Sequence, residues 1–136
     1  MYDSIFKKVK DLDLSERVIF TDYVPNTDLP PLICGAKAYV LPSLWEGFGI
    51  PVVEAQACGV PVVVSNVSSL PEVVENSGIL VNPEKTDLIT DGIKKALDEK
   101  TRGGLVMKGF ENIKRFSWEK CVEETLQVLE KVATKA

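Results

Sequence analysis

The chain has 136 residues, which is enough for one domain and short for two. Its composition, 45% hydrophobic and 26% charged, is typical of a globular protein, and the net charge of −4 argues against a general nucleic-acid binder. Because the sequence contains no histidine, it excludes nucleophile–histidine pairs, histidine general bases and histidine metal ligands.

The cysteines and the hydrophobic runs indicate a cytoplasmic protein. Cys34, Cys58 and Cys121 are scattered among apolar neighbours, and we predict buried, reduced thiols. No CxxC pair is present, so the sequence predicts no metal site. The N-terminus lacks the apolar core of a signal peptide, and every apolar run is shorter than the roughly 20 residues of a membrane-spanning helix.

The first half of the chain alternates between predicted helices and strands. Apolar residues at helical spacing predict a helix over residues 5–12, and the β-rich run at 17–21 predicts a buried strand. A helix from about 28 to 35 and a strand over 38–41 follow. Residues 51–58 form the next predicted helix, with Pro at its first position and Gly directly after its end.

The second half begins with the clearest strand, over 60–65, whose unbroken apolar run predicts burial on both faces. Ser69 and Glu72 match a capping box at the start of a short helix, and a fourth strand covers 78–81. Three amphipathic helices close the chain, the last one capped by Ser117, and we expect the apolar stripe of that last helix, from Trp118 to Leu129, to pack in the core. We therefore predict the α/β class: a parallel Rossmann-like sheet with flanking helices, formed as a single domain by residues 1–136.

The segment over residues 42–61 is the candidate binding site. It holds three Gly, three Pro and two Glu, without any Lys or Arg, between a predicted strand and a predicted helix. Ligands of such sheets bind beside the carboxyl ends of strands. Gly47 and Gly49 would let a ligand approach the backbone, and free amides near Ile50 and Val52 would bind an anion such as phosphate.

Two carboxylates in this segment suit a different chemical group. Glu46 and Glu54 would repel phosphate, but a carboxylate accepts hydrogen bonds well from vicinal hydroxyls. Amides for phosphate and carboxylates for hydroxyls together match a nucleotide sugar. The simpler interpretation is two solvated carboxylates that the helix dipole stabilises.

Several linked motifs of the sequence resemble the retaining glycosyltransferases of group 1 (family 4), which have the GT-B fold. The similarity runs from about residue 18 to residue 118, and the spacing of Glu46 and Glu54 fits the E-x7-E pattern of that family. The other motifs are Pro42-Ser43, Glu46-Gly-Phe-Gly-Ile-Pro51, Gly59-Val-Pro-Val62 and Leu70-Pro-Glu-Val73.

The resemblance implies a role for each matching residue. Glu46 would be the catalytic residue, bonding the donor sugar or stabilising positive charge at its anomeric carbon. Glu54 would accept from the ribose hydroxyls, and Val24, at the end of the strand over 17–21, would lie near the nucleobase. The backbone of the loop and helix start would line the sugar and diphosphate, at Gly47, Phe48, Gly49 and Ile50. The donor would be a UDP-, GDP- or ADP-sugar, used without a metal ion or other cofactor.

The chain also departs from the family. The basic pair that binds the donor diphosphate, two early strands and the N-terminal domain that binds the acceptor sugar or lipid are absent from it. We therefore expect an incomplete donor-binding domain, inactive alone, from the C-terminal part of a cytoplasmic enzyme that could lie at the membrane surface. Without those strands, an exposed sheet edge would favour self-association.

Two alternatives stay open at this stage. The chain could be a non-catalytic nucleotide-binding or interaction module that has kept the fold, whereas a GT-B epimerase or phosphorylase fits poorly without histidine. Trp45 could pack under the loop, which we favour, or form a wall for an acceptor or lipid. For Ser69 and Glu72 we favour a helix cap over a ligand role, and for Cys58 a small core side chain over a nucleophile.

Overall fold

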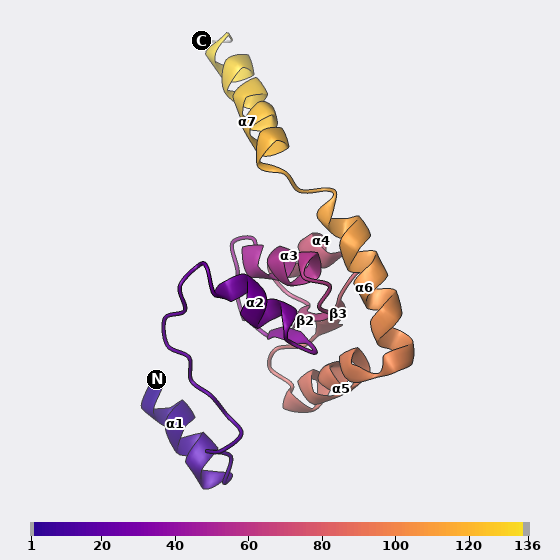
Figure 1. The fold of residues 1–136 in the computed structure, drawn as a ribbon. Coiled ribbons are helices and arrows are strands. Elements are labelled where there is room, and N and C mark those ends of the chain that lie inside the picture. Colours follow the sequence, from indigo (N-terminus) through magenta and orange to yellow (C-terminus); the bar gives the residue numbers. More distant parts are fainter. Residues whose placement is uncertain (1, 135–136) are drawn as a thin grey trace.

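The computed structural model describes residues 2–134. A three-stranded sheet lies between helices, and the two ends of the chain extend away from it (Figure 1). The elements are α1 (Tyr2–Asp11), α2 (Leu29–Cys34), β1 (Tyr39–Leu41), α3 (Ile50–Ala57), β2 (Val62–Ser65), α4 (Leu70–Val74), β3 (Ile79–Val81), α5 (Thr86–Leu97), α6 (Glu99–Ile113) and α7 (Trp118–Ala133).

The sheet is parallel, as the sequence predicted. Its strands lie in the order β1-β2-β3, with Tyr39 opposite Val62 and Val63 opposite Ile79. All four residues of the central strand β2 are buried, which confirms the prediction from its unbroken apolar run. The predicted strands 38–41, 60–65 and 78–81 are therefore confirmed, each slightly shortened at its start.

Helices cover both faces of the sheet, and the alternation of side chains along β2 decides which residue meets which helix. Val62 and Val64 face one core with α3 and α4, whereas Val63 faces a second core with α5. On the second face the helix comes very close, because a Cβ at Gly92 of α5 would lie 2.7 Å from a methyl carbon of Val81. Glycine is thus required for this packing distance.

A buried polar network ties α3 to α6. The amide of Gln56 donates to the hydroxyl of Ser77 at 2.7 Å, and its carbonyl oxygen accepts from Asn112 Nδ2 at 2.8 Å. The same nitrogen of Asn112 donates to the backbone oxygen of Val73 at 2.9 Å. Because α3 begins at the candidate site, this network holds one wall of the site against the rest of the molecule.

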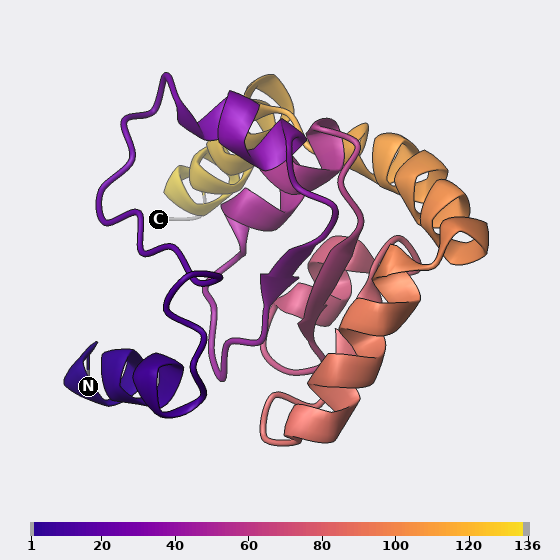
Figure 2. The ribbon, with the colours of Figure 1, turned by 60° about the horizontal axis from the view of Figure 1, so that its bottom comes forward.

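The prediction of a strand over residues 17–21 is wrong. This segment is irregular, and Ile19 is 85% exposed (Figure 2). In a sheet of order 3-2-1-4-5-6 the three observed strands match the last three, so this segment would be the strand at the opposite edge. Two strands would separate it from β1, and without a neighbour its backbone has nothing to pair with.

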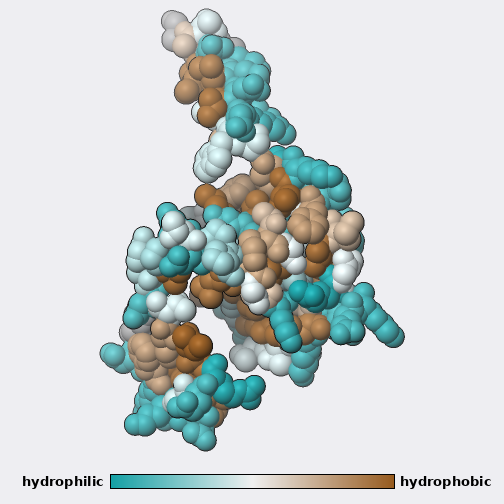
Figure 3. All heavy atoms as spheres, viewed as in Figure 1, coloured by the Kyte–Doolittle hydropathy of each residue, from teal (hydrophilic) through white to brown (hydrophobic). Residues whose placement is uncertain are grey.

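The helix α7 forms where predicted, capped by the Ser117 hydroxyl, which accepts from the Lys120 amide at 3.1 Å. The expectation that its apolar stripe packs in the core is wrong for the part of the chain that the structure describes. Figure 1 shows α7 standing off the body, and in Figure 3 its hydrophobic side chains gather along one side, open to solvent. An amphipathic pattern favours a helix, but it does not determine which surface the apolar face packs against.

The structure also bears on the predictions for the cysteines and for membrane-spanning helices. The cysteines are free, but Cys34 and Cys121 are exposed and Cys58 is half-buried, so the prediction of buried thiols is wrong. Cys34 and Cys121 both lie on helices with no buried residue. Among residues 2–134, no helix is long and apolar enough to cross a membrane.

Candidate functional site

The candidate site is built around four residues that we call the donor loop, Glu46 to Gly49. The loop follows the carboxyl end of β1 and runs directly into α3 (Figure 2). Gly49 has φ 101° and is buried, and a Cβ there would lie 2.6 Å from Leu70 Cδ2. Conformation and space both demand glycine at this position, whereas a Cβ at Gly47 would meet only the Trp45 ring, at 4.0 Å.

The start of α3 offers fewer free amides than the sequence suggested. The Val52 amide donates to the Gly49 oxygen at 2.9 Å, so the prediction that it is free to bind an anion is wrong. Pro51 has no N–H to offer. The Ile50 amide has no protein partner within residues 2–134, and Ile50 remains half-exposed. One amide of the predicted anion site is therefore available.

The two predicted carboxylates differ in how they are held. Glu46 is half-buried, and its Oε1 accepts a hydrogen bond from the Ser43 hydroxyl at 2.8 Å. Its other oxygen, and the whole carboxylate of exposed Glu54 on α3, have no protein partner in the described part of the chain. Both carboxylates can therefore accept hydrogen bonds from a ligand.

The charges of the two carboxylates both affect one side chain, the phenol of Tyr39 on β1. Burial raises the pKa of its phenol, and the negative charges of Glu46 and Glu54 raise that pKa further, because they disfavour a phenolate nearby. The fold thus brings Glu46 and Glu54 near the same side chain. Tyr39 could not be singled out from the sequence, because nothing in a three-residue strand signals which helix its side chain faces.

The serines after β2 contact the donor loop, which corrects the predicted helix cap. Ser69 immediately precedes α4 but makes no side-chain cap bond, and its hydroxyl instead lies 3.0 Å from the Glu46 oxygen and 3.1 Å from the Phe48 oxygen. Ser68 also bonds to Glu46. A capping box predicts hydrogen bonds between the serine side chain and nearby backbone amides. Here the Ser69 hydroxyl instead contacts backbone carbonyls of the donor loop, which is distant in the chain.

Aromatic contacts complete the surroundings of the loop. Phe48 meets Phe116, which lies between α6 and α7, edge to face at 5.5 Å between ring centroids. The Arg115 guanidinium lies 5.0 Å from the centroid of the same Phe116 ring.

Trp45 is 77% exposed, so the favoured interpretation, that it packs under the loop, is wrong within the described chain. Val24 is half-buried on the long irregular connection before α2, and its place beside a nucleobase stays a prediction.

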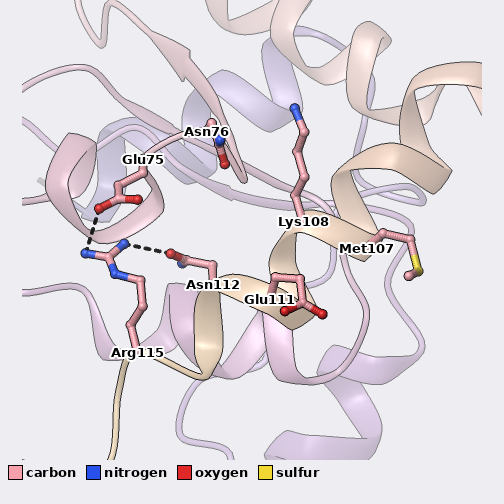
Figure 4. Close-up of a pocket in the computed structure, with 7 residues that line it drawn as sticks. All are labelled: Glu75, Asn76, Met107, Lys108, Glu111, Asn112 and Arg115. Atoms are coloured by element: carbon pink, nitrogen blue, oxygen red, sulfur yellow. Dashed lines mark hydrogen bonds and ion pairs between the residues drawn. The ribbon is translucent and has the colours of Figure 1, made fainter.

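A hollow lies away from the candidate site, between the end of α4 and α6 (Figure 4). Arg115 there pairs with Glu75 at 3.0 Å and with the Asn112 oxygen at 2.8 Å. None of the predicted donor residues lines this hollow. Within residues 2–134 there is also no group of three or more Cys, Asp or Glu side chains that could hold a metal ion.

Comparisons with known proteins point to one family. Residues 1–105 match the family described as glycosyl transferases group 1. The chain is 45% identical over 108 residues to the O-antigen chain mannosyltransferase B of Escherichia coli. That alignment covers 79% of this chain and 28% of the mannosyltransferase, so the chain spans less than a third of that relative.

Solved structures agree with the fold. The sucrose-phosphate synthase of Thermosynechococcus elongatus superposes with a TM-score of 0.86 at 29% identity, covering 97% of this chain and 34% of that one. A structure of Anabaena Alr3699/HepE in complex with UDP and glucose superposes with a TM-score of 0.79 at 23% identity. It covers 98% of this chain and 36% of its own, and at that identity it supports the fold alone.

Proposed function

The chain belongs to the group 1 family of glycosyl transferases, and from this premise we propose that it forms the donor-binding part of a retaining enzyme with the GT-B fold. That enzyme would move a sugar from a nucleotide-diphospho-sugar to an acceptor hydroxyl. The observation that carries the proposal is that Glu46 and Glu54 both lie near Tyr39, each with oxygens that have no protein partner in the described part of the chain.

Each group of the site would bind one part of the donor. Glu54 would accept hydrogen bonds from the ribose hydroxyls. Glu46 would accept hydrogen bonds from the hydroxyls of the donor sugar, through the carboxylate oxygen that Ser43 does not contact. The Ile50 amide would donate to the diphosphate at the start of α3. As the diphosphate leaves, the carboxylate of Glu46 would stabilise the positive charge that develops at the anomeric carbon. The proposal involves no metal ion.

The names of the related proteins bear on the choice of donor. A mannosyltransferase and a sucrose-phosphate synthase are among the relatives, and one neighbour was solved with UDP and glucose. We propose a nucleotide-sugar donor for this chain without choosing among UDP, GDP and ADP. The acceptor, a sugar or a lipid, would be bound by a segment outside this chain.

Calorimetric titration of the chain with UDP, GDP and ADP tests the donor site. We expect one nucleotide to bind, and we expect Glu54→Ala to weaken its affinity about 5- to 150-fold, which corresponds to roughly 1–3 kcal/mol for a lost polar contact. Glu99→Ala is the matched control, because Glu99 is an exposed helical glutamate away from the site. Absence of binding for all three nucleotides, or equal affinity in Glu54→Ala, would contradict the proposal.

The open edge of the sheet supports a second part of the proposal. Within residues 2–134, β1 pairs only with β2, so the outer edge of Tyr39–Leu41 has no strand beside it. An unpaired edge of a parallel sheet can take up another strand, and we propose self-association through it. Light scattering tests this, since a monodisperse monomer at high concentration would contradict it.

A further inference from the structure

Ser68 makes two hydrogen bonds to the backbone of a single residue, Glu46. Its hydroxyl donates to the Glu46 carbonyl oxygen at 2.7 Å and accepts from the Glu46 amide at 3.2 Å. Ser69 adds a contact to the same carbonyl at 3.0 Å. Both backbone polar groups of Glu46 are therefore held by a loop that lies 22 residues further along the chain.

The conformation of Ser68 makes this arrangement notable. Its φ is +60°, in the left-handed region that glycine adopts freely and that strains an L-residue with a Cβ. A glycine at this position would relieve the strain but would lack the hydroxyl. The two bonds to Glu46 are what a serine offers at this position and a glycine does not.

The side chain of Glu46 is held as well. Ser43 bonds Oε1 at 2.8 Å, so the backbone and one carboxylate oxygen are both fixed, and the second oxygen stays available. A carboxylate held in this way has little freedom left to lose when a ligand binds, which favours binding by pre-organisation.

We propose that Ser68 is a positioning residue that places Glu46 for the sugar part of the donor. This inference rests on the proposed function and deepens it, because it assigns the sugar, and not the nucleotide, to the part of the site that Ser68 controls. Glu54 lies on α3, to which the Ser68 side chain makes no hydrogen bond within residues 2–134, so the nucleotide contacts should not depend on Ser68.

The variant Ser68→Gly tests the proposal, because glycine accepts the same φ and the fold is preserved. The affinity of the intact chain is measured for each nucleoside diphosphate and for its sugar derivative: GDP with GDP-mannose, UDP with UDP-glucose, ADP with ADP-glucose. We expect the additional affinity contributed by the sugar to fall about tenfold, the typical effect of a lost hydrogen bond, while the affinity for the bare nucleotide stays unchanged. Ser15→Gly, at an exposed serine outside the site, is the matched control.

A second readout needs no ligand. Amide hydrogen exchange of Glu46, followed by NMR, should accelerate about tenfold or more in Ser68→Gly, because the amide loses its acceptor, and should not change in Ser15→Gly. Equal loss of affinity for nucleotide and nucleotide sugar would overturn the positioning role, and so would an unchanged sugar contribution. A parent chain that binds no nucleotide would instead refute the proposed function, even if the exchange of Glu46 accelerates in the variant.

Discussion

The central unit of the molecule, from β1 to α6, and the C-terminal helix α7 are built from similar amphipathic patterns but are buried very differently. Between Val52 and Ala96 the apolar side chains of the two cores are at most 5% exposed. In α7, whose residues 118–133 are all described, none is buried, and Leu126 and Leu129 are 52% and 60% exposed. Helix formation is thus encoded locally, whereas burial depends on having a second surface to pack against.

The largest expected difference between the two regions comes from removing one leucine side chain from each. Leu70→Ala should lower the free energy of unfolding by about 2–5 kcal/mol, because it leaves a cavity between α4 and the buried Gly49. Leu129→Ala should change it by less than about 0.5 kcal/mol, because the side chain is already solvated. Chemical denaturation measures both. Similar losses would mean that α7 is covered in solution.

The buried polar network gives the second comparison. Asn112→Ala should cost about 1–3 kcal/mol of unfolding free energy, since it leaves the oxygens of Gln56 and Val73 buried without their donor. Asn76→Ala is the matched control, because Asn76 is exposed at the end of α4. Urea denaturation of both variants separates the network from the general effect of replacing asparagine. A cost below that of the control would contradict the role of the network.

Replacing two helical glycines by alanine should change the stability of the protein in opposite directions. Gly92→Ala puts a Cβ 2.7 Å from Val81 and 3.0 Å from Val63, so we expect a loss of about 1–3 kcal/mol from overpacking. At Gly103 of α6 a Cβ meets no atom within 4 Å, and Gly103→Ala should stabilise the protein by about 1 kcal/mol through helix propensity. Thermal unfolding of both variants measures the signs, and a stabilising Gly92→Ala would refute the close packing of α5 on the sheet.

These glycines also mark the limit of what could be predicted from the sequence. The apolar runs at 38–41, 60–65 and 78–81 predicted the three observed strands, and apolar spacing with capping, Pro and Gly signals predicted the helices, because each of these signals is local. The apolar run at 17–21 could not by itself show that this segment lacks a neighbouring strand, since pairing depends on parts of a sheet that are distant in the chain. Nor could it show that Gly92 touches the sheet and Gly103 touches nothing.

In the candidate site, too, features set by local sequence were predicted and features set by distant contacts were not. Glu46, Glu54 and Gly49 were predicted from spacing and residue type, and the structure brings both carboxylates near Tyr39. Ser69 was predicted as a cap, because a serine three residues before a glutamate has a familiar local partner. Its actual partners are carbonyls more than 20 residues away, and only the folded chain reveals them. The residues that support a site are therefore harder to predict from the sequence than its candidate ligand-binding residues.

The smallest expected effect concerns the thiols where α2 meets α3, at the border of the central unit. A side-chain hydrogen bond with Cys34, followed by burial, raises the pKa of Cys58 to about 11, so the folded protein holds this proton more tightly than the unfolded chain. The stability that this bond contributes is present below the ordinary value of 9.0 and is lost as the pH rises through about 11. In a Cys121→Ser background, adding Cys34→Ala should lower the pKa of Cys58 toward 9.0, measured by thiolate absorbance. A Cys58 titration that does not move would show that the two thiols do not interact, and would leave the hydrogen bond from Cys58 Sγ to the Pro30 oxygen, at 3.8 Å, as the polar contact of Cys58 with α2.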